Sequence, residues 1–176
     1  MNHQNHLDLL RHGIPQIGGV WADFGSGTGA FTLALAELIG STGEIYAVDQ
    51  DRGALQEQAK VMQARFPENT VHYLKADFTE MLELPPLDGV VMANSLHFVA
   101  DRRKEGVLQQ IKTYLKPEGR ILIVEYNTDS GNTWVPHPFS YPTWETMAKQ
   151  VGFEHSRLLA TYPSRFLQEI YAAASW

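Results

Sequence analysis

The chain has 176 residues, of which 44% are hydrophobic, so we expect one domain, 1–176, with a sizeable core. Lys and Arg number 14 against 20 Asp and Glu, and the resulting net charge of −6 disfavours nucleic acid as a partner. The lack of cysteine excludes disulfides and thiolate chemistry, and the lack of a signal-like or bilayer-length apolar run predicts a cytoplasmic location without a membrane span.

Apolar runs of strand length alternate with segments of helical periodicity along the chain. Strands are predicted at 20–24, 44–49, 71–74, 87–93, 120–126, 154–161 and 166–174. Helices are predicted at 7–11, 30–39, 51–65 (with Asp51 as N-cap), 101–115 and 143–151. This alternation predicts a doubly wound α/β fold with a seven-stranded, mostly parallel sheet.

The connections between these elements also carry information. The segment 116–119 contains Pro and Gly and predicts a stop and turn before the strand at 120–126. The segment 127–142 predicts a loop too long to be only a connector, which is typical of a functional loop. A short link at 162–165 predicts a hairpin, so the C-terminal strand should run antiparallel to the sheet.

A glycine-rich turn separates the first strand from the helix at 30–39. Gly25, Gly27 and Gly29 allow a tight backbone turn that brings a ligand close to main-chain N–H groups. The same segment also fits a dinucleotide fingerprint, with Asp49 as an acid for a ribose. The glycines alone therefore predict a nucleotide-like ligand without deciding which one.

The sequence Asp23-Phe24-Gly25-Ser26-Gly27-Thr28-Gly29 resembles the first motif of class I S-adenosylmethionine-dependent methyltransferases. Further segments match that family in order, at 46–49, 76–78 and 115–120. The chain looks most like the small-molecule, methyltransferase type 11-like group that includes quinone-biosynthesis enzymes. The resemblance implies a Rossmann-like methyltransferase fold and S-adenosylmethionine as cofactor.

Physical needs of the cofactor agree with the positions that this resemblance implies. A ribose diol needs an acceptor such as Asp49, and adenine needs an acceptor and an apolar face. The methionine carboxylate suits the loop N–H groups and the helix N-terminus, and the ammonium suits Asp23 and the backbone carbonyls near Asn94. The implied cofactor contacts are Asp23, Gly25, Ser26, Gly27, Gly29, Asp49, Gln50, Asp77, Phe78 and Asn94.

The acceptor should lie at the carboxyl ends of the strands, near 94–98 and 125–141. His97 is the candidate general base, since imidazole takes up a proton near neutral pH, although a structural histidine is an alternative. Glu125, His137 and Tyr141 are candidate acceptor contacts. The aromatic residues of 134–144 predict either an acceptor pocket or core. The basic run 102–104 predicts a solvated rim, with contact to an acidic acceptor as the alternative. No metal site is expected.

Three functions remain open from the sequence. The first is methyl transfer to an O, N or C nucleophile of a small molecule by in-line displacement, with the oligomeric state not predicted. The second is an NAD(P)-binding oxidoreductase, although the chain lacks a Tyr-x-x-x-Lys pair. The third is a non-catalytic cofactor-binding module of the same fold.

Overall fold

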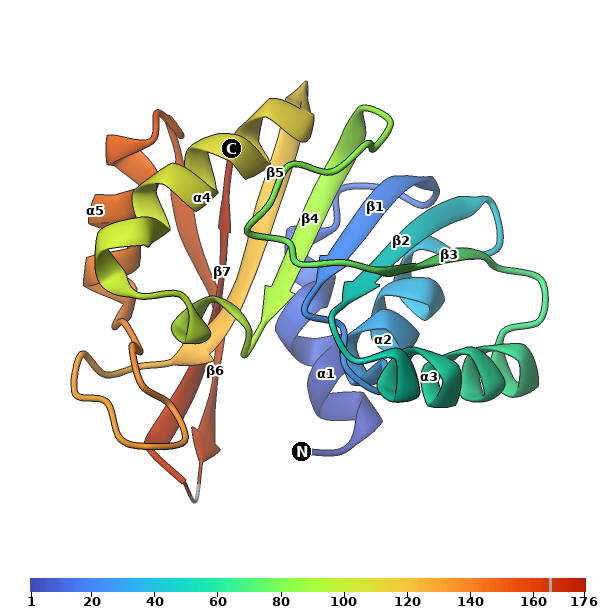
Figure 1. Cartoon of the computed structure of the whole chain (residues 1–176), viewed down its shortest axis with the longest axis horizontal. Coiled ribbons are helices and arrows are strands. Elements are labelled where there is room, and N and C mark those ends of the chain that lie inside the picture. Colours follow the sequence, from blue (N-terminus) through green and yellow to red (C-terminus); the bar gives the residue numbers. More distant parts are fainter. Residues whose placement is uncertain (165) are drawn as a thin grey trace.

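The computed structural model describes residues 1–164 and 166–176, whose strands form one seven-stranded sheet in the order β3-β2-β1-β4-β5-β7-β6 (Figure 1). The strands are β1 (Gly19–Phe24), β2 (Gly43–Asp49), β3 (Thr70–Lys75), β4 (Leu87–Ala93), β5 (Leu115–Tyr126), β6 (Ser156–Ser164) and β7 (Gln168–Ser175). Neighbours from β3 to β5 pair in parallel, and β7 pairs antiparallel to both β5 and β6. The predicted doubly wound sheet with an antiparallel C-terminal strand is therefore confirmed.

Helices cover both faces of the sheet. The helices are α1 (His3–Leu10), α2 (Ala30–Ile39), α3 (Arg52–Arg65), α4 (Asp101–Tyr114) and α5 (Tyr141–Gln150), with short 3-10 turns η1 (Arg11–Gly13) and η2 (Leu96–Phe98). The buried residues of α1, α2 and α3 pack on one face, and those of α4 and α5 pack on the other. In Figure 1 the first group lies on the side of β1 to β3, and α4 and α5 lie over β5 and β7.

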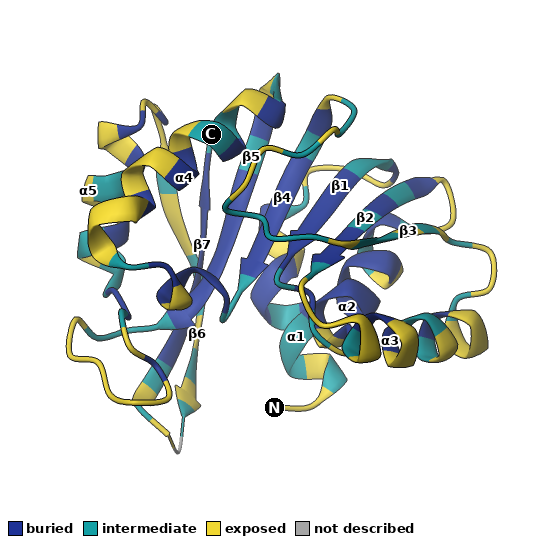
Figure 2. Cartoon of the chain, in the orientation of Figure 1, coloured by how far each residue is buried: buried dark blue, intermediate teal, exposed yellow. Residues whose placement is uncertain are grey.

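Burial explains why the central segments form strands. Val90, Val91 and Met92 of β4 are fully buried, as expected for a parallel strand that is covered on both faces. Figure 2 shows continuous burial along the central strands, whereas the outer faces of α3, α4 and α5 are exposed. None of the helices in 1–164 and 166–176 combines the length and hydrophobicity needed to cross a bilayer.

Most predicted boundaries hold to within two residues, and the cap of α3 is confirmed. Asp51 accepts hydrogen bonds from the N–H groups of Gly53 and Ala54 at 2.7 and 3.2 Å, which satisfies two donors at the start of α3. The helix α1 begins earlier than predicted, at His3, because Asn2 and Asn5 form a reciprocal capping box.

Two predicted connections differ from the structure. The segment 116–119 is a bulge within β5, because Leu115 already pairs with Leu87 before the register resumes at Gly89 and Arg120. At the hairpin, residues 162–164 belong to β6 and pair with 168–170, so the link is shorter than predicted. Arg165, which the prediction placed in this link, lies outside the described residues.

Gly89 offers a direct test of packing in β4. A Cβ added there would lie 2.2 Å from Cζ3 of the buried Trp21 ring. We expect Gly89→Ala to lower the free energy of unfolding by about 1–3 kcal/mol through overpacking. Urea unfolding followed by circular dichroism measures the change.

Gly106→Ala is the matched control. Gly106 is exposed in α4, and no described atom beyond its own helix lies within 4 Å of an added Cβ. The same substitution should raise stability there by about 0.5–1 kcal/mol, because alanine favours a helix interior. Equal effects at both positions would contradict the packing argument.

Candidate functional site

The glycine-rich turn is held against the end of β2. The N–H groups of Gly25 and Ser26 both donate to the Val48 carbonyl, at 2.8 and 3.1 Å, and the Gly27 N–H donates to Asp49 Oδ2 at 2.8 Å. The Gly29 N–H donates to the Ser26 carbonyl at 2.9 Å. These four N–H groups therefore already have partners within the protein, and carboxylate binding by the loop N–H groups stays a prediction. The first turn of α2, which has no side-chain cap among the described residues, is the other predicted anion-binding end of this segment.

Close packing explains why glycine stands at two positions of this turn. Gly25 and Gly29 have φ of +77° and +90°, which side chains rarely allow. A Cβ at Gly25 would lie 2.4 Å from Ser95 Cβ, and one at Gly29 would lie 2.4 Å from Gln58 Cγ. The turn is thus pressed between the residues that follow β4 and helix α3.

A buried polar chain connects the turn to Asp23. The Ser26 hydroxyl donates to Gln58 Oε1 at 3.1 Å, and Gln58 Nε2 donates to Thr32 Oγ1 at 2.7 Å. Thr32 in turn donates to Asp23 Oδ2 at 2.5 Å. Burial raises the pKa of Asp23 to about 7, and the Thr32 hydrogen bond opposes this shift. Sequence reasoning missed Thr32 and Gln58, whose only signal was a polar residue on an otherwise apolar helix face.

Asp49 lies half-buried at the end of β2 with both carboxylate oxygens in use. Oδ2 accepts from Gly27, and Oδ1 accepts from the Asp51 N–H at 2.8 Å. Each oxygen has a second lone pair, so the carboxylate can still accept from two hydroxyls. Gln50 next to it is exposed.

Asp77 and Phe78 follow β3. The Thr79 N–H and hydroxyl both donate to Asp77 Oδ1, at 2.8 and 2.7 Å. The Phe78 ring is parallel to the Phe24 ring, with centroids 6.0 Å apart, and it approaches Gly25. This places an acid and an apolar face next to the glycine-rich turn, as adenine requires.

Asn94 follows β4 and has a strained backbone, with φ of +53°. Its N–H donates to the Val124 carbonyl at 2.8 Å, and its Oδ1 is buried without a hydrogen-bond partner in the part of the chain that the structure describes. Because buried polar atoms are normally hydrogen-bonded, this oxygen is available to a donor group of a ligand.

Two cavities meet at Asn94. The first, of about 280 Å³, contains Asp23 and the glycine-rich turn, and it is also lined by His6 and Phe31, whose rings lie 4.6 Å apart. The second, of about 470 Å³, is lined by Asn94, His97, Phe98, Tyr126, Trp134, Val135 and Phe166. Asn94 therefore lies between the cavity that contains the glycine-rich turn and a largely aromatic cavity.

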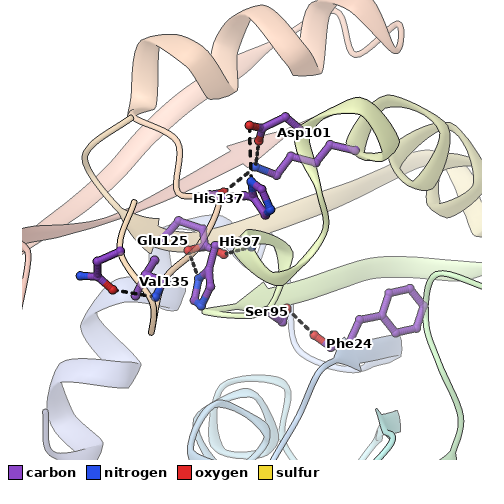
Figure 3. Close-up of polar contacts among 9 residues, drawn as sticks. Phe24, Ser95, His97, Asp101, Glu125, Val135 and His137 are labelled. Atoms are coloured by element: carbon purple, nitrogen blue, oxygen red, sulfur yellow. Dashed lines mark hydrogen bonds and ion pairs between the residues drawn. The ribbon is translucent and has the colours of Figure 1, made fainter. Parts of the chain in front are cut away.

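Glu125 holds both the ring and the main chain of His97, which lines the second cavity (Figure 3). His97 Nδ1 lies 2.7 Å from Glu125 Oε2, and the His97 main-chain N–H donates to Oε1 at 3.2 Å. The side chains are 3% and 0% exposed, respectively. A carboxylate only accepts, so Nδ1 is the donor, which leaves Nε2 as the ring nitrogen that can take up a proton. Glu125 therefore orients His97, and it is not among the described residues that line the cavity, so its contact with an acceptor stays a prediction.

His137 and Tyr141 also lie away from the lining of this cavity. His137 Nδ1 is 3.6 Å from Asp101 Oδ2, so its ring is directed to the start of α4 (Figure 3). The Tyr141 hydroxyl donates to Glu145 at 2.8 Å, and burial, with Glu145, raises the pKa of Tyr141 to about 12. Neither residue is among the described residues that line this cavity, and their contact with an acceptor stays a prediction.

Lys104 is buried, contrary to the expectation of a solvated rim. Its side chain is 2% exposed, it lies 2.7 Å from Asp101 Oδ1, and its Nζ is 4.7 Å from the centre of the Phe139 ring. Nζ also donates to the His137 carbonyl, and the His137 N–H donates to the His97 carbonyl at 3.1 Å. Lys104 thus attaches the 127–140 loop to α4 beside His97. Within 1–164 and 166–176, no three His, Asp or Glu side chains are arranged to hold a metal ion.

The known proteins that resemble this chain in sequence are methyltransferases. A family model described as a methyltransferase domain matches residues 22–119. A 2-phytyl-1,4-naphtoquinone methyltransferase of Trichormus variabilis is 29% identical over 62% of this chain and 48% of its own length. A ubiquinone/menaquinone biosynthesis C-methyltransferase of Azotobacter vinelandii is 32% identical over 61% of this chain and 42% of its own length. The chain thus spans less than half the length of these relatives.

One solved structure illustrates the shared fold. The 1,6-didemethyltoxoflavin-N1-methyltransferase of Burkholderia thailandensis, with bound 1,6-didemethyltoxoflavin and S-adenosylhomocysteine, superposes with a TM-score of 0.76. It is 20% identical, and the match covers 98% of this chain and 77% of that one. At this identity the likeness shows the fold.

The raised pKa of Asp23 predicts a pH-dependent stability. The folded protein retains a proton that the unfolded chain releases above about pH 4, so this contribution is full below that pH and is lost as pH rises towards 7. The difference in unfolding free energy between the wild type and Asp23→Asn should fall by up to about 1.4 kcal/mol per pH unit in this window. Urea unfolding from pH 4.5 to 7.5 measures it, and a constant difference would refute the assignment.

Lys104→Met should detach the 127–140 loop. The His137 carbonyl loses its donor, and we expect a loss of about 1–3 kcal/mol in stability. Faster hydrogen exchange of the His137 N–H should accompany the loss. Arg102→Met, at an exposed position of the same helix, should stay within about 0.5 kcal/mol of the wild type. Similar losses in both variants would contradict a specific anchor.

Proposed function

The chain belongs to the methyltransferase-domain family, whose model matches residues 22–119, and from this premise we propose that it transfers a methyl group from S-adenosylmethionine to a small-molecule acceptor. The observation that carries the proposal is the meeting of two cavities at Asn94. One holds the acid and turn of the family motif, and the other contains His97. A donor in the first cavity and an acceptor in the second would allow in-line displacement, for which orientation alone can contribute about 7–11 kcal/mol.

The cofactor assignment follows the chemistry of each group. Asp49 accepts from the ribose hydroxyls, and Asp77 and Phe78, with Gln50 alongside, bind adenine. The methionine end occupies the cavity that contains Asp23, where the buried Oδ1 of Asn94 gains a donor from the ammonium. The start of α2 faces the carboxylate. Because a cation favours the charged form of Asp23, cofactor binding should release a proton below pH 7.

His97 is the proposed general base. Its Nδ1 is occupied by Glu125, so Nε2 accepts the acceptor's proton. Glu125 acts through His97 and is a positioning residue. When the acceptor is an alcohol or phenol, its oxygen bonds to the methyl carbon, the carbon–sulfur bond breaks with its electron pair moving to sulfur, and the proton passes to His97 and then to water.

Isothermal calorimetry with S-adenosylmethionine, S-adenosylhomocysteine and NAD tests the cofactor class. We expect both sulfur compounds to bind and NAD not to bind. Binding of NAD alone would support the oxidoreductase alternative. Binding of S-adenosylmethionine without turnover of any phenol, amine, thiol or carboxylate in a broad panel would favour a non-catalytic module.

Asp49→Ala should weaken S-adenosylhomocysteine binding by about 1.5–3 kcal/mol, the typical loss for a hydrogen bond to a charged group. Since Asp49 also holds Gly27, a deoxyribose analogue separates the two effects: its affinity should fall much less in the variant than that of the parent compound. Glu57→Ala, exposed on α3, is the control. Equal losses for both ligands would remove Asp49 from the ribose site.

A further inference from the structure

The second cavity has walls of aromatic side chains that are unusually exposed. Phe98, Trp134 and Phe166 are 65%, 75% and 48% exposed, and Tyr126 completes the walls. Large aromatic residues are normally buried, and an exposed apolar group of this kind is typical of a binding surface. These residues come from η2, the 127–140 loop, the hairpin and the end of β5, so the fold gathers them from four separate segments.

The rings have an arrangement that suits a planar guest. The Phe98 ring lies 4.3 Å from the His97 ring, at 49° to it, and the Phe166 ring lies 5.9 Å from the Tyr126 ring. Because aromatic rings pair face to face or edge to face, the exposed Phe98 and Phe166 rings are suitable partners for a flat aromatic molecule. A saturated ring of equal size would contact the same side chains but could not form stacked or edge-to-face aromatic contacts with them.

The charge of the residues that line the cavity also limits which guest can bind. The described lining contains no Asp, Glu, Lys or Arg, and the Glu125 carboxylate paired with His97 leaves no net positive charge there in either protonation state of the imidazole. Burial, and then Glu125, raises the pKa of Tyr126, so its hydroxyl also stays neutral. An anionic guest would lose solvation there without gaining a cation as a partner.

We propose that this cavity binds a flat, uncharged aromatic acceptor that carries a weakly acidic hydroxyl directed at Nε2 of His97. The proposal rests on the proposed function and specifies its substrate class. The hydroxyl donates to the only acceptor nitrogen that Glu125 leaves on the ring, and the junction at Asn94 brings its oxygen towards the cofactor cavity.

The test is calorimetry of 2-naphthol with protein saturated with S-adenosylhomocysteine. Three probes are compared with it: decahydro-2-naphthol is a saturated alcohol and is not flat, 6-hydroxy-2-naphthoate keeps the hydroxyl and adds a negative charge, and 2-methylnaphthalene replaces the hydroxyl with a methyl group. We expect each to bind about tenfold more weakly than 2-naphthol, since stacking and a hydrogen bond each contribute about 1 kcal/mol or more.

Wall variants locate the site. Phe98→Ala and Trp134→Ala should each weaken 2-naphthol binding about tenfold and leave S-adenosylhomocysteine binding unchanged. Met81→Ala is the control, because Met81 is 70% exposed and lies outside the cavity lining. Retained naphthol affinity in both wall variants would overturn the proposal, as would equal or tighter binding of any of the three probes.

Failure of this proposal is distinct from failure of the proposed function. If S-adenosylhomocysteine binds and 2-naphthol does not, the aromatic acceptor is wrong and the cofactor assignment stands. If S-adenosylhomocysteine does not bind, the proposed function fails, and this specification of its substrate fails with it.

Discussion

The hydrogen bonds between the glycine-rich turn and the end of β2 are the constraint on which the site depends. Through Val48 and Asp49, β2 fixes the turn in one conformation before any ligand arrives. The same turn is pressed against Ser95, whose hydroxyl donates to the Phe24 carbonyl at 2.7 Å (Figure 3). These contacts join the ends of β1, β2 and β4. The positions of the two cavities on either side of Asn94 therefore depend on how these strand ends are held together.

The parts of the molecule that sequence predicted well are those governed by local pattern. Strand β4 and helix α2 were predicted at their observed bounds because apolar periodicity and glycine breaks define them within a few residues. The same holds for the cap at Asp51. The bulge in β5 was missed because Pro and Gly favour a turn locally, whereas pairing with Leu87 keeps the strand in the sheet.

The acceptor side was less predictable because its geometry depends on contacts distant in sequence. His97 and Glu125 were both named, but only the packing of η2 over β5 shows that one lies beneath the other. Lys104 in a run of three basic residues looked solvated, and its burial depends on the return of the 127–140 loop. No local pattern encodes the direction in which the His137 ring points.

The attachment of this loop at His137 has a consequence for sequence variation. Lys104 binds the His137 carbonyl, and His97 binds the His137 N–H, so both contacts use the main chain. Any residue that retains an N–H, which excludes only proline, can satisfy them at this position. The side chains at the rim of the aromatic cavity, including Trp134, can therefore vary while the loop stays attached to Lys104 and His97. Related chains could in this way bind different acceptors without a change in the residues around His97.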